Sequence, residues 1–171
     1  MCNNISLSPH FKLQEFTASA TARRHGLDNT PPPEAVENLK ALCVHTLEPL
    51  REALGLPIVI TSGYRTKALN KLLVCHSKKS QHMSGEAADF HISVQGEGVT
   101  NNGSPTRREL LIKAFRQMIL DEGIVFDQLI LYPSFIHVSY VRSGSNRSKL
   151  TKANGQGSFC ALTRDEALAI V

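Results

Sequence analysis

Two motifs that lie far apart along the chain carry the side chains that most restrict its fold. The first motif, residues 80–91, contains His82 and Asp89, and the second, residues 135–140, contains His137. Imidazole nitrogens and a carboxylate oxygen suit zinc, and three protein ligands leave a fourth tetrahedral position open, as in catalytic sites. The sequence therefore predicts one zinc ion per chain, bound by these three residues, and indicates metal-assisted hydrolysis.

The length and charge of the chain limit its organisation and its partners. A chain of 171 residues, of which 42% are hydrophobic, is long enough for one hydrophobic core, so we expect a single domain over residues 1–171. The 19 Lys and Arg residues exceed the 15 Asp and Glu residues, but the charges are scattered and form no nucleic-acid-binding tract. We therefore expect no nucleic-acid partner, and the sequence makes no prediction of oligomeric state.

The four cysteines, Cys2, Cys43, Cys75 and Cys160, show no paired spacing of the kind that binds metals. Free thiols in a reducing compartment are the expectation. Cys75 and His76 are adjacent, but the pair lacks a second half and is not expected to bind a metal.

Hydrophobic periodicity predicts a helix that begins near Pro33 and ends at Gly55, with Pro49 kinking or interrupting it. Further helices are expected at 68–73, at 106–123 and from Thr163. Strands are expected at 57–62, 87–93, 128–132 and 135–141, the last two as a hairpin. Residues 1–10 and 142–160 are expected to be irregular, and 95–104 to form a polar connector. The pattern indicates an α+β fold with a small, mostly antiparallel sheet and helices packed on it.

Arg65 follows the first predicted strand, in the segment Ser62-Gly63-Tyr64-Arg65. Its guanidinium offers a planar fork for a peptide carboxylate or a developing oxyanion, and the alternative is a salt bridge that fixes the loop. Tyr64 and Ser80 are grouped with Arg65 as substrate-binding residues. Ser80 alternatively positions His82.

Three segments together, Ser62-Gly63-Tyr64-Arg65, Ser80-x-His82-x-x-Gly85-x-Ala87-x-Asp89 and His137-Val138-Ser139, resemble a known family in order and spacing. The family is the zinc D-Ala-D-Ala carboxypeptidases, which include D,D-dipeptidases and phage L-alanyl-D-glutamate endopeptidases and share a fold with the Hedgehog signalling domain. The resemblance covers most of the chain, from Phe16 to Tyr140. It implies that His82, Asp89 and His137 bind zinc, that Arg65 binds or polarises the substrate, and that peptidoglycan peptides are the partners.

The chain departs from this family at the general base. Family members carry a Glu or Asp a few residues before the last His ligand, whereas residues 130–136 contain no carboxylate here. Glu86 and Asp127 are the nearest acids in sequence and are the candidates for the general base. His91 shares a strand face with Asp89 and is a third catalytic candidate, as a fourth ligand or a proton donor, the alternative being a histidine that supports the ligands or is partly buried.

Three functions stay open. The first is a zinc peptidase that hydrolyses peptidoglycan stem peptides, as a carboxypeptidase or an endopeptidase. The second is a catalytically weak or inactive zinc-bearing module that binds the cell wall or a protein. The third is a zinc hydrolase of another small peptide.

The N-terminal residues contain neither the basic region nor the apolar region of an export signal, and no segment has the apolar length of a membrane span. We therefore expect a cytoplasmic protein with no membrane span. Such a protein would reach the cell wall by the release that phage or prophage lysins undergo.

Overall fold

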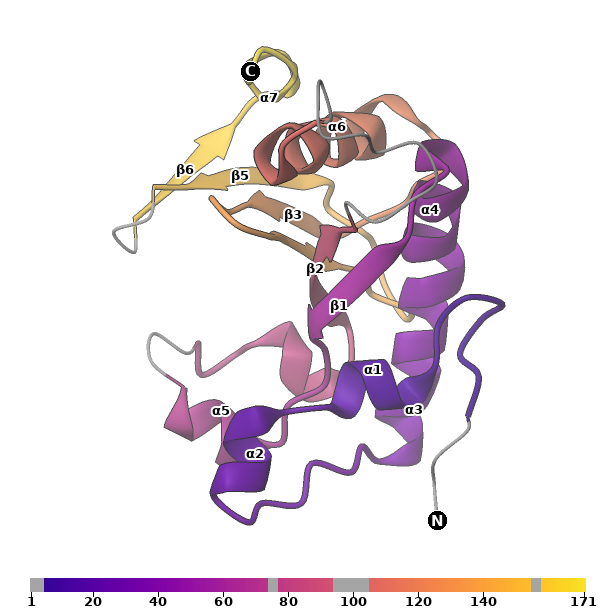
Figure 1. Cartoon of the computed structure of the whole chain (residues 1–171), viewed down its shortest axis with the longest axis vertical. Helices are drawn as coiled ribbons and strands as arrows, with labels where there is room; N and C mark the ends of the chain where they lie inside the picture. The colour runs from indigo at the N-terminus through magenta and orange to yellow at the C-terminus, as the bar shows by residue number, and fades with distance from the viewer. Residues whose placement is uncertain (1–4, 74–76, 94–104, 155–157) are drawn as a thin grey trace.

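The computed structural model describes residues 5–73, 77–93, 105–154 and 158–171. A six-stranded sheet in the order β1-β2-β4-β3-β5-β6 forms its centre (Figure 1). The strands are β1 (Ile58–Ser62), β2 (Ala87–Ile92), β3 (Gln128–Leu131), β4 (Ile136–Ser139), β5 (Lys149–Ala153) and β6 (Phe159–Leu162). Neighbouring strands are antiparallel except β3 and β5, which are parallel. The predicted α+β class with a mostly antiparallel sheet is confirmed.

Helices cover part of this sheet, and α6 contacts both β2 and β3 (Figure 1). The helices are α1 (Leu13–Thr17), α2 (Ala20–Arg24), α3 (Pro33–Leu42), α4 (Glu48–Leu54), α5 (Lys67–Leu72), α6 (Arg107–Leu120) and α7 (Arg164–Leu168). A π-helical turn, η1 (Cys43–Leu47), joins α3 to α4, and a 3₁₀ turn, η2 (Gln81–Ser84), precedes β2. Within the described ranges, no helix has both the length and the apolar character needed to cross a membrane.

The two faces of the central strands have different chemistry. Successive side chains of a strand point to opposite faces, so alternate residues share one face. One face belongs to the hydrophobic core and carries Phe90, Leu129, Leu131, Ile136 and Val138, each buried completely. Asp89, Ile130 and His137 occupy the other face, where they lie opposite one another on adjacent strands. The core therefore fixes the strands whose outer face carries Asp89 and His137, two of the three predicted metal ligands.

The long helix does not end at Pro49: α3 passes into the π-helical turn η1, and α4 continues through the proline to Leu54. Proline has no N–H to donate to the carbonyl of His45, four residues earlier, and the π-helical turn ends just before it. The N–H of Val125 donates to this carbonyl instead (3.1 Å), and the Thr46 hydroxyl donates to the Val125 carbonyl (2.6 Å). The proline thus leaves the His45 carbonyl free within the helix, and this carbonyl binds the segment before β3.

The expectation that residues 142–160 are irregular is wrong, because β5 lies within this range and β6 begins in it. β5 pairs in parallel with β3, and β6 pairs with β5. These pairings depend on the exposed edge of β3, which local sequence patterns do not reveal. Residues 5–10 contain no helix or strand apart from a single bridge between Ser6 and Lys12.

Cys43 and Cys160 carry free thiols. Cys2, the Cys75-His76 pair and the connector expected at 95–104 lie outside the described residues.

A side chain at Gly85 should lower the stability of the folded protein. Its φ is +74°, and an added Cβ would collide with the backbone carbonyl of Ala35. Gly55 has a similar φ of +64°, but open space surrounds it. We expect Gly85→Ala to lower the free energy of unfolding by about 2–5 kcal/mol and Gly55→Ala by about 1–2 kcal/mol, because only the first adds a collision to the left-handed backbone strain. Urea unfolding of both variants measures the difference, and equal losses would contradict the collision.

Candidate metal centre

The three predicted metal ligands meet at one point on the outer face of the sheet. Asp89 on β2 lies opposite His137 on β4, and η2 supplies His82. Nε2 of His82 lies 3.2 Å from Nδ1 of His137, and Oδ1 of Asp89 lies 3.3 Å from the former and 2.8 Å from the latter. Tetrahedral zinc with bonds of ~2.0–2.1 Å separates its ligand atoms by ~3.3 Å, so small movements would let these three hold an ion.

The loop after β1 fixes the orientation of His82. The Nδ1 atom of His82 lies 2.6 Å from the carbonyl oxygen of Gly63, which can only accept, so Nδ1 carries the proton. The N–H of Arg65 donates in turn to the carbonyl of His82 (3.1 Å). Nε2 is therefore left with its lone pair toward Asp89 and His137, which is the tautomer a metal requires.

Arg65 fixes the carboxylate of Asp89 in a similar way. Its Nη2 donates to Oδ2 of Asp89 (2.9 Å), and its Nε donates to the Ser62 hydroxyl (3.0 Å). Oδ1 of the carboxylate remains directed at the two imidazoles. Arg65 therefore forms a salt bridge, as in the structural interpretation. It also lines the cavity described below, as the substrate-binding interpretation requires.

Electrostatics favour the protonation states that bind a metal. Burial alone would raise the pKa of Asp89, but the neighbouring His82 and His137 hold it well below its usual range. Burial lowers the pKa of His82, although Asp89 opposes the shift. The site therefore combines an ionised carboxylate with a neutral His82 imidazole, as metal binding demands.

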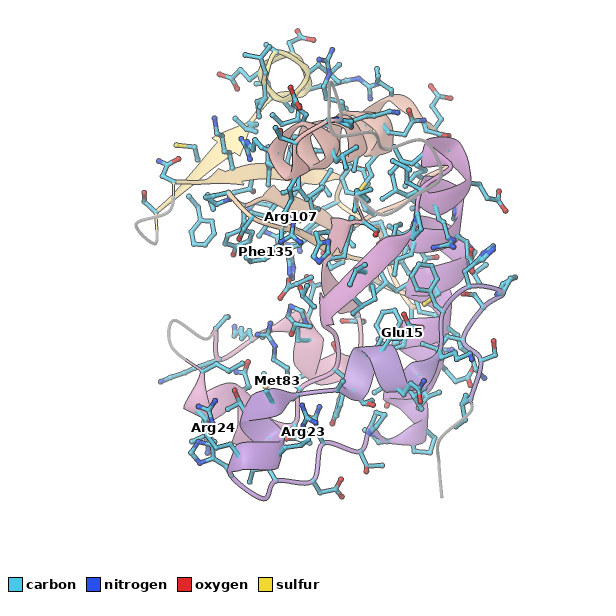
Figure 2. All side chains as sticks on the ribbon, viewed as in Figure 1. Glu15, Arg23, Arg24, Met83, Arg107 and Phe135 are labelled. Carbon is cyan, nitrogen blue, oxygen red and sulfur yellow. The ribbon has the colours of Figure 1, made fainter. Side chains whose placement is uncertain are left out.

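The cluster borders a cavity of about 420 Å³, within the usual size range for ligand pockets. Leu73, residues 77–80 and η2 contribute to one side of it, and the outer face of β3 and β4 with Phe159 of β6 contributes to the other. Phe135, labelled in Figure 2, lies on the sheet side. The lining residues are Arg65, Leu73, Ser77, Lys79, Ser80, Gln81, His82, Asp89, Gln128, Ile130, Tyr132, Phe135, His137 and Phe159. A larger cavity of about 520 Å³ beside α1 and α2 contains only one described residue of a metal-binding type, Asp28.

Of the predicted substrate-binding residues, Arg65 and Ser80 line the cavity and Tyr64 does not. Tyr64 is only 7% exposed and belongs to the hydrophobic core. Its N–H donates to the carbonyl of Phe16 (2.7 Å), which turns the residue toward α1. The structure gives Tyr64 a packing role beside α1.

Two of these three catalytic candidates, Glu86 and His91, have partners away from the cavity. The Glu86 carboxylate accepts from the Ser84 hydroxyl (2.8 Å), within the turn that leads into β2. His91 shares the face of Asp89, as predicted, but it lies opposite Val59, and its ring nitrogens lie near the carbonyl of Ile92 and near Arg107. Neither residue lines the cavity, so the structure does not bring them to the metal ligands.

Asp127, the third candidate, is fully buried in a network of its own. Nε of Arg147 donates to its Oδ1 (2.7 Å), and Nε2 of Gln81 donates to its Oδ2 (3.0 Å). The hydrogen bonds from Arg147 lower the pKa of Asp127 despite its burial. Both oxygens are engaged, and Gln81 lines the cavity, so Asp127 holds a cavity residue in place without facing the cavity itself.

Sequence reasoning missed several residues that shape the site. They are the carbonyl of Gly63 and the cavity side chains of Lys79, Gln128, Tyr132, Phe135 and Phe159. Alternation along the strand could have identified part of this set, because Gln128, Ile130 and Tyr132 are two residues apart and Ile130 pairs with His137.

Comparison with known families agrees with this site. The family model described as Peptidase M15 matches residues 9–104, more than half of the chain. The chain therefore belongs to the Peptidase M15 family, whose members are zinc metallopeptidases, and the resemblance seen in the sequence is confirmed. The matched range contains Arg65, His82 and Asp89, and the fold adds His137 from β4. A search of the curated proteins found no match.

We expect His82→Ala and His137→Ala each to remove most of the bound zinc, because two remaining ligands hold the ion far less tightly than three. Metal analysis of the purified proteins after dialysis gives the zinc content. His91→Ala is the matched control and should keep one zinc per chain, since His91 lies outside the cluster. Retention of zinc by both ligand variants would refute the site.

We expect Asp127→Asn to lower the free energy of unfolding by about 1.5–3 kcal/mol at neutral pH, because charge-assisted hydrogen bonds to Arg147 are lost. The folded protein has the lower pKa, so the carboxylate stabilises it above the unfolded pKa of about 3.9, and this contribution disappears as the pH falls. Denaturant unfolding at pH 7 and pH 3 should show the gap between wild type and variant shrinking at the acidic pH. A gap independent of pH would contradict this role.

Proposed function

We propose that this protein is a zinc-dependent peptidase that hydrolyses peptidoglycan stem peptides. The observation that carries the proposal is the convergence of the His82, Asp89 and His137 ligand atoms, all within 4.8 Å of one another, on the wall of a cavity that also contains Arg65. Zinc bound there supplies a Lewis acid for a peptide carbonyl and for water. Membership of the Peptidase M15 family supports the reaction class.

Arg65 is suited to bind the peptide beside the metal ligands. Its Nε and Nη2 atoms are engaged by Ser62 and Asp89, and Nη1 has no hydrogen-bond partner among the residues described. The guanidinium therefore keeps a donor for a substrate carboxylate or carbonyl while the other two hold it in position. Lys79 adds a second positive charge to the same cavity.

A zinc-bearing binding module is the second candidate function. It is favoured by one observation: Asp89 is the only carboxylate among the described cavity residues, and it is already a metal ligand. General-base assistance is worth about a hundred- to ten-thousand-fold in rate, so an enzyme of this kind without a second acid would be slow unless another group compensates.

Mass spectrometry of purified muropeptides incubated with the zinc-loaded protein separates the two candidates. A peptidase releases products, whereas the His137→Ala protein, which lacks a ligand, does not. Intact muropeptides at high protein concentration, together with saturable binding of the same muropeptides, would replace the peptidase with the binding module.

We expect Arg65→Lys to lower kcat/KM for muropeptides by about ten-fold or more at saturating zinc, because lysine keeps the charge but loses the planar fork. Arg142→Lys is the matched control, since Arg142 bonds the side chain of Asn38 and does not line the cavity. If excess zinc restored full activity to Arg65→Lys, Arg65 would act only by orienting Asp89.

A further inference from the structure

Tyr132 places a hydrogen-bond donor in the cavity and is not one of the predicted metal ligands. It directly follows β3, is half-buried, and lines the same cavity as the three metal ligands. No acid other than Asp89 is found among the cavity residues that the structure describes. The Tyr132 hydroxyl is therefore a group in this cavity that can donate a hydrogen bond to a substrate.

The strand register places Tyr132 beside the metal centre. Ile130 pairs with His137, and Tyr132 follows Ile130 by two residues, on the same face of the sheet. Two residues of a strand advance by ~6–7 Å, a distance comparable with the reach of a tyrosine side chain. Tyr132, directly after β3, and His137, on the adjacent β4, therefore line the same cavity from nearby positions.

Neighbouring contacts restrict the ring of Tyr132. It stacks on Phe135, with centroids 4.2 Å apart and planes 13° from parallel, and meets Phe159 edge-on at 6.0 Å. Its backbone N–H donates to the carbonyl of Phe135 (3.0 Å), and Nη1 of Arg108 donates to the carbonyl of Tyr132 itself (3.3 Å). Both ring and backbone are held, which is what a positioned donor requires.

The hydroxyl itself is available. It makes no hydrogen bond to any residue in the described part of the chain. Burial raises the pKa of the Tyr132 phenol, and the charge of Asp89 raises it further while Arg65 opposes it. Tyr132 therefore keeps its proton at neutral pH and can donate it in a hydrogen bond.

We propose that the Tyr132 hydroxyl donates a hydrogen bond to the oxygen of the scissile carbonyl as that oxygen gains negative charge. The proposal rests on the peptidase function proposed above and assigns a further catalytic residue to it. No proton is transferred from Tyr132, because the bond acts by stabilising charge. The donor strengthens its interaction during the reaction, so it raises kcat and has little effect on substrate binding.

Tyr132→Phe removes the hydroxyl and retains the ring that stacks on Phe135. With muropeptide substrate and zinc-loaded protein, we expect kcat to fall by about a hundred-fold and KM to change little. Zinc content and thermal unfolding should match those of the wild type. Tyr140→Phe is the matched control, because Tyr140 stacks on His45 away from the cavity and its loss of a hydroxyl should leave kcat unchanged.

A second measurement tests the donor without turnover. A phosphinate dipeptide, which presents a tetrahedral anion, should bind zinc-loaded Tyr132→Phe about a hundred-fold more weakly than the wild type by titration calorimetry. Equal phosphinate affinities, or equal kcat values in an active wild type, would overturn the assignment of Tyr132. A wild type that binds the phosphinate in a Tyr132-dependent way but leaves muropeptides intact would instead overturn the proposed substrate.

Discussion

The hydrogen bond between the Gly63 carbonyl and Nδ1 of His82 links the loop after β1 to a predicted metal ligand, and the orientation of that ligand depends on it. Gly63 packs against α1 so closely that an added Cβ would lie 2.6 Å from backbone atoms of Phe16. The position of the loop after β1 is therefore set by the core, and the loop in turn selects the tautomer of His82. Packing far from solvent thus controls which ring nitrogen faces the cavity.

Local signals in the sequence were sufficient for the elements with regular patterns. The capping boxes of Thr106 with Glu109 and of Thr163 with Glu166 begin α6 and α7 as expected. Residue chemistry and spacing suggested His82, Asp89 and His137 as a set, and the resemblance to the zinc D-Ala-D-Ala carboxypeptidases selected them among the 7 His and 15 Asp and Glu residues of the chain. The structure then places their ligand atoms together.

Features that depend on distant partners could not be predicted in the same way. β5 consists of Lys149–Ala153, a short segment without clear alternation, and it becomes a strand because β3 offers a free edge. Asp127 is the nearest acid to the His137 strand in sequence, yet Arg147 and Gln81 occupy its oxygens. Tyr64 adjoins Arg65, but the turn directs it into the core. In each case the deciding contact comes from another part of the chain.

The strand order separates two properties of the site. Asp89 and His137 belong to β2 and β4 in the interior of the sheet, whereas Phe159, an aromatic residue of the cavity wall, belongs to β6 at its edge. Changes in an edge hairpin disturb fewer neighbours than changes in a central strand. Replacement of the β5–β6 hairpin therefore offers a route by which evolution or protein engineering could alter peptide selectivity while the inherited metal-binding chemistry is preserved.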